Sequence, residues 1–388
     1  MAAAPDPSLD LGRARELFEA STDFTIGLEE EFAIVDPESL ELAQRFEELF
    51  AACQEDDLLA ESAAGELIAS EIEIRSGRSE DFAEATERQR EHRARLFALA
   101  DARGVGLAAT GTHPWADYLD QRIIDTPHYQ RLKRDLGYVV QRNNTWSLHL
   151  HMGIRGADRA IAVCDSLRGL LPLLLAVSAN SPFLDRRDTG LHSVRTEIFT
   201  RVFPRCGVHE PFGDWRTYAD FVELLGRTNT IVESTQLWWS VRPHHEFGTV
   251  EVRICDAQTR GEESFGLAAL IAACIAQTAL DQDDGRLPEP QSEREIDENL
   301  WRATRYGMDG KMIDFTKRAE IAAGAELERV LAWTEPARDS LGLDVGLPEL
   351  NGAQRARRAF ADGETIESIY RGALAETRRT YVPEGVLG

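Results

Sequence analysis

The feature that most constrains the fold of this chain is a hydrophobic segment interrupted by three consecutive carboxylates. Residues 26–35 read IGLEEEFAIV, and the carboxylates are Glu29, Glu30 and Glu31. Successive side chains of an extended strand point to opposite faces. Glu29 and Glu31 therefore share one face, whereas Glu30 shares the other face with the aliphatic residues. We expect Glu30 to have a basic or hydrogen-bonding partner, because a buried carboxylate without one is costly.

Three further segments show the same alternation, with one aliphatic face and one polar face. They are EIEIR at 71–75, SLHLHMG at 147–153 and TVEVRIC at 249–255. Half-buried antiparallel strands often alternate in this way, with solvated Glu–Arg pairs between neighbours. A solvated face usually mixes Thr, Lys, Ser and Gln, however, whereas these segments carry paired Glu and His. The four segments together predict a sheet with one face built for chemistry.

The spacing of these strands favours an α+β fold. The intervening stretches differ greatly in length and show no regular βαβ alternation, and helical patterns cover 81–103, 158–179, 262–280 and much of the C-terminal part. A sheet with helices on one face follows. No linker divides the chain, so we expect an N-terminal extension over 1–20 and a single catalytic domain over 21–388 with a helical C-terminal part.

Composition narrows the classes of partner. The chain has 67 Asp and Glu against 43 Lys and Arg, a net charge of −24 that disfavours nucleic acid and anionic membranes. The first residues lack the basic and apolar regions of a secretory signal, which predicts a cytoplasmic protein. Two long apolar stretches, within 158–179 and 262–280, are expected to be buried helices. The five cysteines form no CxxC pair, which is typical of reduced thiols.

Carboxylates that converge on one face repel one another unless a cation lies among them. Hard oxygen ligands favour Mg²⁺, with Mn²⁺ as the alternative. A divalent cation combined with arginine is the usual means of holding nucleotide phosphates during phosphoryl transfer. Because the sequence contains no GxxxxGK[ST] motif, any ATP would be held by metal and sheet instead of a P-loop.

Seven segments, in order, resemble the type 2 glutamate–cysteine ligases, also described as carboxylate–amine ligases: GLEEEF, EIEI, GTHPWAD, HLHMGI, SANSPFLDRRDTG, WWSVRP and GTVEVRICD. The resemblance extends from about residue 24 to the C-terminal region. It implies a fold like the catalytic domain of glutamine synthetase, with a curved, mostly antiparallel sheet that holds ATP and metal on its concave face. It also implies ATP-dependent joining of a carboxylate to an amine through an acyl phosphate, with weak glutamate–cysteine ligase activity.

The resemblance assigns roles to particular residues. Arg253 and Glu31 are the expected catalytic residues, and Arg253 would neutralise the γ-phosphate unless it only forms an in-sheet salt bridge to Glu73 or Glu251. Glu66 needs a bend near residue 65 to join the others, because its odd separation from Glu73 would place it on the opposite face. The expected metal ligands are Glu29, Glu31, Glu66, Glu73 and Glu251.

The expected substrate or nucleotide contacts are His149, His151, Arg195, Thr112 and His113. Arg195 would clamp the α-carboxylate of the acid substrate, with a surface pair to Glu197 as the alternative. His151, Thr112 and His113 could instead be structural hydrogen-bonding groups.

Two segments depart from the family pattern. They are NNTWSLHLHMG, and TGLHSVRTE where many members have the TGYASYRT type. Both border the expected substrate pocket, so the sequence does not identify the acid or the amine substrate. Glutathione-like synthesis, an ergothioneine-type thiol pathway and an unrelated γ-glutamyl amide are the alternatives. Small-molecule substrates are the expected partners, and a homodimer is implied by resemblance.

Two functions of other classes are alternatives to a ligase. One is a zinc hydrolase in which His113 and His192 join the HLH pair. The other is a nucleotide-binding protein without catalysis.

Overall fold

The computed structural model describes residues 7–382. Its centre is a seven-stranded sheet with the order β10-β11-β5-β1-β3-β2, in which β4 also pairs with β1, and every pairing is antiparallel. The strands are β1 (Ile26–Val35), β2 (Ala63–Ala64), β3 (Glu71–Arg75), β4 (Gly106–Ala108), β5 (Ser147–Gly153), β10 (Val241–His244) and β11 (Thr249–Asp256). The predicted antiparallel sheet is confirmed, and all four alternating segments belong to it.

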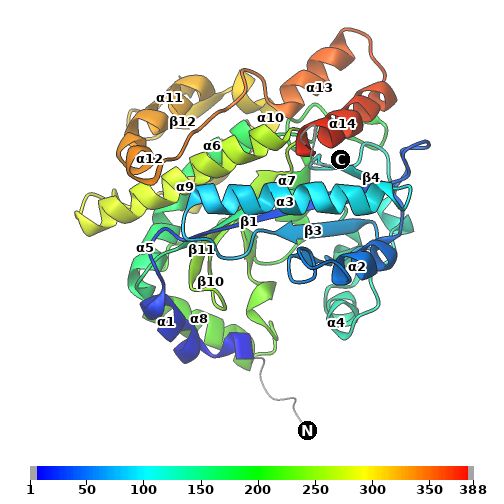
Figure 1. Ribbon diagram of the computed structural model, residues 1–388. Helices are drawn as coiled ribbons and strands as arrows, with labels where there is room; N and C mark the ends of the chain where they lie inside the picture. The colour runs from blue at the N-terminus through cyan, green and yellow to red at the C-terminus, as the bar shows by residue number, and fades with distance from the viewer. Residues whose placement is uncertain (1–6, 383–388) are drawn as a thin grey trace.

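Helices cover one face of this sheet. In Figure 1, α3 and α9 lie across it, and contacts join α3 to β1 and β3, α9 to β5, and α6 to β11. The α+β fold class is therefore confirmed. The helices are α1 (Leu11–Ala20), α2 (Phe46–Gln54), α3 (Phe82–Asp101), α4 (Pro127–Leu136), α5 (Ala157–Leu167), α6 (Leu171–Ser178), α7 (Val194–Val202), α8 (Trp215–Arg227), α9 (Gly261–Asp283), α10 (Glu293–Tyr306), α11 (Ala323–Trp333), α12 (Glu335–Leu341), α13 (Gly352–Ala361) and α14 (Ile366–Tyr381).

Three small two-stranded sheets lie outside the main sheet. They are β6 (Phe183–Leu184) with β7 (Arg187–Asp188), β8 (Cys206–Gly207) with β9 (Trp238–Trp239), and β12 (Lys311–Asp314) with β13 (Ala319–Ala322). Of these, β8 and β9 are parallel and bring Trp238 to the polar side of the main sheet, where it lines a cavity.

The aliphatic sides of the alternating strands form the core. Ile26 and Leu28 of β1 pack in a cluster with α5, α6 and α9, while Phe32 and Ile34, further along the same strand, pack in a second cluster with α2 and α3. This burial against the helices leaves the Glu, His and Arg side chains of the same strands on the opposite face, with the exception of Glu30.

The two apolar stretches are buried helices, as the sequence predicts. The segments Ala157–Ser178 and Gly261–Asp283 are long and apolar enough to cross a membrane, but 78% and 89% of their most apolar windows are buried within the fold. The first is not one continuous α-helix, because α5 ends at Leu167 and α6 begins after a 3₁₀ turn, Arg168–Leu170. Pro172 explains the break, since proline lacks the N–H of the helical ladder and its ring clashes with the carbonyl four residues earlier.

The expected N-terminal extension contains ordered structure within its described part. A short 3₁₀ turn, Pro7–Leu9, precedes α1. Phe18 of α1 is fully buried, belongs to the same core cluster as Ile26 and Leu28, and contacts the Trp215 ring with centroids 5.5 Å apart. Residues 1–6 lie outside the described residues.

Glu30 has the buried partner that its position demands. Arg93 of α3 forms a bidentate pair with its carboxylate, Gln89 donates at 2.9 Å and Ser264 of α9 at 2.5 Å. The Arg93 guanidinium also lies over the Phe265 ring, 3.8 Å from its centroid. Burial alone would raise the pKa of Glu30, but the charge and hydrogen bonds of Arg93 outweigh burial and lower this pKa. The pair thus ties β1 to two helices.

We predict that Arg93→Ala destabilises the protein by about 3–5 kcal/mol, because removing one member of a buried ion pair leaves the other charge uncompensated. Glu91→Ala, two residues earlier at an exposed position of α3, is the control and should change the free energy of unfolding by less than about 0.5 kcal/mol. Urea unfolding of both variants measures the difference. Equal effects would show that the Glu30 pair does not anchor the sheet.

Candidate functional site

The register of the sheet brings the predicted site residues together. Glu29 lies opposite His149 of β5 and Arg75 of β3, while Glu31 lies opposite Glu73. On the other side of β5, His151 lies opposite Glu251 of β11. All of these side chains line one cavity of about 320 Å³ on the polar face of the sheet.

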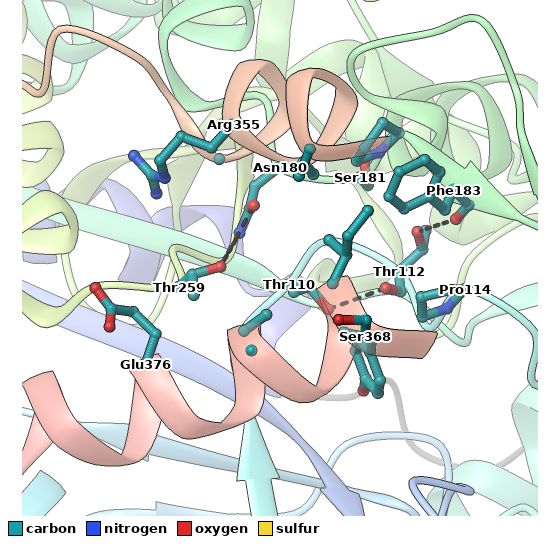
Figure 2. Close-up of a pocket in the computed structure, with 18 of the residues that line it drawn as sticks. Thr110, Thr112, Pro114, Asn180, Ser181, Phe183, Thr259, Arg355, Ser368 and Glu376 are labelled. Carbon is teal, nitrogen blue, oxygen red and sulfur yellow. Dashed lines mark hydrogen bonds between the residues drawn. The ribbon is translucent and has the colours of Figure 1, made fainter. Parts of the chain in front are cut away.

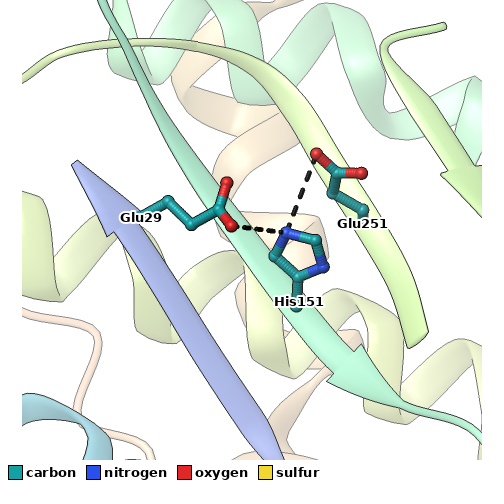
Figure 3. A group of neighbouring side chains, drawn as sticks. All are labelled: Glu29, His151 and Glu251. Carbon is teal, nitrogen blue, oxygen red and sulfur yellow. Dashed lines mark ion pairs between the residues drawn. The ribbon is translucent and has the colours of Figure 1, made fainter. Parts of the chain in front are cut away.

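Glu29, His151 and Glu251 form a first group of candidate metal ligands. Figure 3 shows them projecting toward one another from β1, β5 and β11. The Nε2 atom of His151 lies 3.3 Å from Glu29 Oε1 and 3.7 Å from Glu251 Oε1. This buried nitrogen makes no hydrogen bond to another described residue. One ligand atom from each residue lies within 4.8 Å of the others, so the three can converge on one cation.

Glu31, Glu66 and Glu73 form a second group, and their carboxylate oxygens also lie within 4.8 Å of one another. Glu66 comes from the irregular connection between β2 and β3, and its side chain lines the same cavity as Glu73. Glu31 is held in place by Ser147, whose backbone N–H and hydroxyl each donate to it at 2.6 Å. The sequence-predicted metal ligands thus all meet in one cavity.

The two groups differ in their electrostatics. Burial, reinforced by the Glu31 charge, raises the pKa of Glu66 to about 7, and burial with the Glu29 charge raises the pKa of Glu73 well above its usual range. Burial would also raise the pKa of Glu251, but Arg242 and Arg253 hold it well below its usual value. Arg75 donates to Glu73 at 2.5 Å, but burial and the neighbouring carboxylates outweigh this single positive charge in the second group. A divalent cation there would relieve the repulsion.

The pKa of Glu29 is also held well below its usual value. Burial opposes this shift, but His151, His149 and Arg75 together outweigh it. Burial, helped by the nearby Arg253 charge, lowers the pKa of His149, so this imidazole is neutral near pH 7. His149 contacts Glu29 at 3.2 Å and Ser147 at 2.8 Å, which fixes its ring in the cavity wall.

Arg253 lies at an irregularity of β11. The register of β11 against β5 shifts between Val252 and Cys255, so β11 contains one extra residue at this point. Such bulges bend a strand and re-aim its side chains. Arg253 lines the cavity and forms an ion pair with Glu251, and its buried Nε makes no hydrogen bond to a described residue. The in-sheet pair anticipated from the sequence thus exists, and the guanidinium still faces the cavity.

Arg195 is a buried residue of the same cavity. Its guanidinium donates to the backbone carbonyls of Ile254 at 3.0 Å and Arg253 at 3.3 Å, and it lies 3.8 Å from Asp256. The alternative of a surface pair with Glu197 is wrong, since the side chain is buried at the end of β11. Glu197 instead lies 4.0 Å from the arginine one helical turn onward.

The structure does not bring Thr112 and His113 to this cavity. Figure 2 shows Thr112 in a second cavity, of about 400 Å³, where its hydroxyl donates to the carbonyl of Phe183 at 3.1 Å beneath α13 and α14. His113 is buried, and its Nε2 lies 2.7 Å from the carbonyl of Leu40. Both side chains are engaged by backbone carbonyls outside the polar cavity, so this geometry favours the alternative of structural hydrogen-bonding groups.

The histidines of the zinc hydrolase alternative are also dispersed. His113 is engaged by the Leu40 carbonyl, and His192 lines a separate cavity with Arg305 and Asp309. Neither lines the cavity of His149 and His151. Neither predicted histidine therefore joins the HLH pair, whose neighbours in the cavity are Glu29, Glu251 and His244.

Several cavity residues had no role predicted from the sequence. Arg242 of β10 donates to Glu251 at 2.6 Å. Its position opposite Glu251 follows from the pairing of β10 with β11, and the segment WWSVRP is too short for its alternation to predict that pairing. His128 of α4 and Glu233, which precedes β9, meet at 3.0 Å and belong to segments with no sequence signal. Alternation placed Arg75 and Glu71 on the polar face without assigning them a function.

The fold has solved counterparts among amide-forming ligases. It is similar to glutamate–cysteine ligase from Francisella tularensis in complex with AMP, with a TM-score of 0.65 at 12% identity, covering 94% of this chain and 90% of that one. It is also similar to a bifunctional glutathione synthetase from Pasteurella multocida, with a TM-score of 0.64 at 11% identity, covering 96% of this chain and 54% of the other. At these identities the likeness concerns the fold.

Sequence comparison gives the family. The model of glutamate-cysteine ligase family 2 (GCS2) matches residues 25–363. A provisionally named glutamate–cysteine ligase 2-2 of Rubrobacter xylanophilus is 35% identical over 381 residues, covering 95% of this chain and 98% of the relative. A similarly named protein of Solibacter usitatus is 35% identical, covering 91% and 93%. The chain belongs to glutamate–cysteine ligase family 2 and is a ligase of the carboxylate–amine class.

We predict that Glu66→Gln makes the metal-free protein as stable as the wild type or more stable at pH 8. The folded pKa of Glu66, about 7, lies above that of an unfolded glutamate, so the stabilising proton is lost as pH rises toward 7 and above. The melting temperature of the variant, measured in chelator, should therefore gain on the wild type between pH 5 and pH 8. Glu61→Gln, an exposed change just before β2, should show no such trend.

Mg²⁺ or Mn²⁺ should raise the melting temperature of the wild type and of Glu61→Gln, because a cation that binds only the folded state stabilises it. The same additions should raise that of Glu66→Gln much less. Equal metal stabilisation of all three proteins would remove Glu66 from the ligand set.

Proposed function

We propose that this protein is an ATP-dependent ligase that joins the side-chain carboxylate of a glutamate-like acid to an amine such as cysteine. The observation that carries the proposal is the convergence of two carboxylate groups on one sheet face, flanked by Arg253, Arg75 and Arg242. Family membership supports the reaction class. The AMP complex of the similar Francisella ligase supports a nucleotide as the second substrate.

The residues present fit divalent cations. Two groups of three ligands offer carboxylate oxygens and one imidazole nitrogen, and both groups are largely buried. Glu31, Glu66 and Glu73 would hold one cation, and Glu29, His151 and Glu251 a second. This donor set suits Mg²⁺ or Mn²⁺. Bound there, the cations would neutralise phosphate oxygens during phosphoryl transfer.

The side chains of the cavity then have distinct tasks. Arg253 has an unpaired Nε facing the cavity and counters the charge on the transferred phosphoryl group. Arg195, fixed by two backbone carbonyls and also with an unpaired Nε, is assigned to the α-carboxylate of the acid. Ser147 orients Glu31 through its two hydrogen bonds.

The chemistry proceeds in two steps. A carboxylate oxygen of the acid displaces ADP from the γ-phosphorus and yields an acyl phosphate. The amine nitrogen then attacks the acyl carbon, phosphate leaves, and a base accepts the amine proton. The product is a γ-glutamyl amide. A homodimeric state and a cytoplasmic location remain predictions.

The direct test is ADP and phosphate release from Mg²⁺-ATP with glutamate across a panel of amines that includes cysteine, with and without chelator. We expect release that requires acid and amine together and that stops with chelator, with the best amine giving the highest rate. Nucleotide binding without turnover for any pair would contradict the ligase and favour a binding role.

We predict that Glu251→Gln lowers kcat by at least about 10²-fold, because such sites accelerate reactions mainly by stabilising the charge that develops in the transition state. The melting temperature should also fall, because Arg242 and Arg253 lose their buried counter-charge, so the rate is measured below that temperature on protein shown to be folded by circular dichroism. Glu223→Gln, an exposed change on α8, is the control and should keep full activity. Full ligase activity in a folded Glu251→Gln protein would show that Glu251 holds no essential cation.

A further inference from the structure

One large apolar side chain stands out at the rim of the ligase cavity. Nine large hydrophobic residues are markedly exposed in the described part of the chain, and among them only Phe247 lines this cavity. It is 53% exposed. Single exposed apolar residues are ordinary, but an aromatic ring that lines a binding cavity offers a flat face on which a ligand can stack.

The local fold holds this ring rigidly. Phe247 lies in the turn between β10 and β11, which is closed by the Gly248 N–H donating to the His244 carbonyl at 3.0 Å. Gly248 has φ +62°, and a Cβ there would lie 2.8 Å from the carbonyl oxygen of Leu17 in α1. The turn therefore needs glycine and is packed against α1.

One face of the Phe247 ring is backed by another ring. The His244 imidazole stacks on it with centroids 4.3 Å apart and an interplanar angle of 12°, and the His151 ring meets it edge-on at 5.6 Å. Burial lowers the pKa of His244 well below its usual value, so this histidine is neutral near pH 7. Because His244 covers one face, the exposed surface of Phe247 is its other face and edge.

The cavity residues follow one another along the strands from this ring. His151 comes next to Phe247, then Glu251 and Glu29, then Arg253, and Arg195 lies at the far end beside Ile254. Thr249 and Arg253 are separated by about 13 Å of extended strand. The order is an aromatic surface, then candidate metal-binding carboxylates and then arginine, which matches the order of base, phosphates and phosphoryl-accepting carboxylate in an ATP-dependent ligation.

We infer that Phe247, backed by His244, is the stacking platform for the purine base of the nucleotide, and that the acid and amine bind at the opposite, Arg195 end of the cavity. This inference rests on the proposed function. Base–aromatic stacking tolerates any base, since each has a π-face, so Phe247 would supply affinity for the base without reading its identity.

The test distinguishes the contribution of the base to binding from that of the phosphates. Binding of ATP and of inorganic tripolyphosphate, each with Mg²⁺, is measured by calorimetry for the wild type and Phe247→Ala. We expect Phe247→Ala to weaken ATP binding by about 10- to 100-fold, as loss of one stacked base implies. Tripolyphosphate binding should be unchanged, because that ligand has no base. Phe247→Tyr should restore ATP binding.

Phe221→Ala, which removes another exposed phenylalanine on α8 outside the cavity, is the matched control and should bind both ligands like the wild type. Unchanged ATP binding by Phe247→Ala, or equal weakening of ATP and tripolyphosphate, would overturn the inference and leave the proposed ligase intact. A Phe247-dependent ATP affinity without ligation would support the inference and overturn the proposed reaction. A wild type that binds no nucleotide would overturn both.

Discussion

The structure depends on holding like charges together. Glu31, Glu66 and Glu73 would separate in solution, yet antiparallel register and the connection between β2 and β3 keep their oxygens within 4.8 Å. The free energy for this arrangement comes from the other face of the same strands, where aliphatic side chains are buried against α3, α6 and α9. Stability and site thus occupy opposite faces of one sheet, which is why the repulsion can be tolerated without loss of the fold.

The three adjacent glutamates occupy two different environments, because successive side chains of a strand point to opposite faces. Glu30 points into the helices and is satisfied by Arg93, Gln89 and Ser264 without a metal. Glu29 and Glu31 point into the cavity, where their neighbours are histidine, serine and further carboxylates. The buried pair also fixes the position of β1, so the structural carboxylate supports the geometry of the two candidate ligands beside it.

The sequence pattern predicted those features that depend only on the geometry of a single strand. The period-two alternation was sufficient for the strands, for the separation of Glu30 from its neighbours and for most of the candidate ligands. It was insufficient for Thr112 and His113, whose turn packs elsewhere, and for Arg242, which reaches Glu251 through a cross-strand register. The bulge at Arg253 and the break before Pro172 also needed the structure to locate, although proline supplied a physical reason for the second.

The sequence by itself determined which side chains share a face of a strand, because backbone stereochemistry forces successive residues to opposite sides. It also determined the family, through motifs spread over most of the chain. Only the tertiary structure decided which faces meet, in what order the strands pair and how far apart the carboxylates lie. Those quantities depend on pairings such as Glu29 with His149 and His151 with Glu251, which join residues distant in the chain and which no local preference encodes.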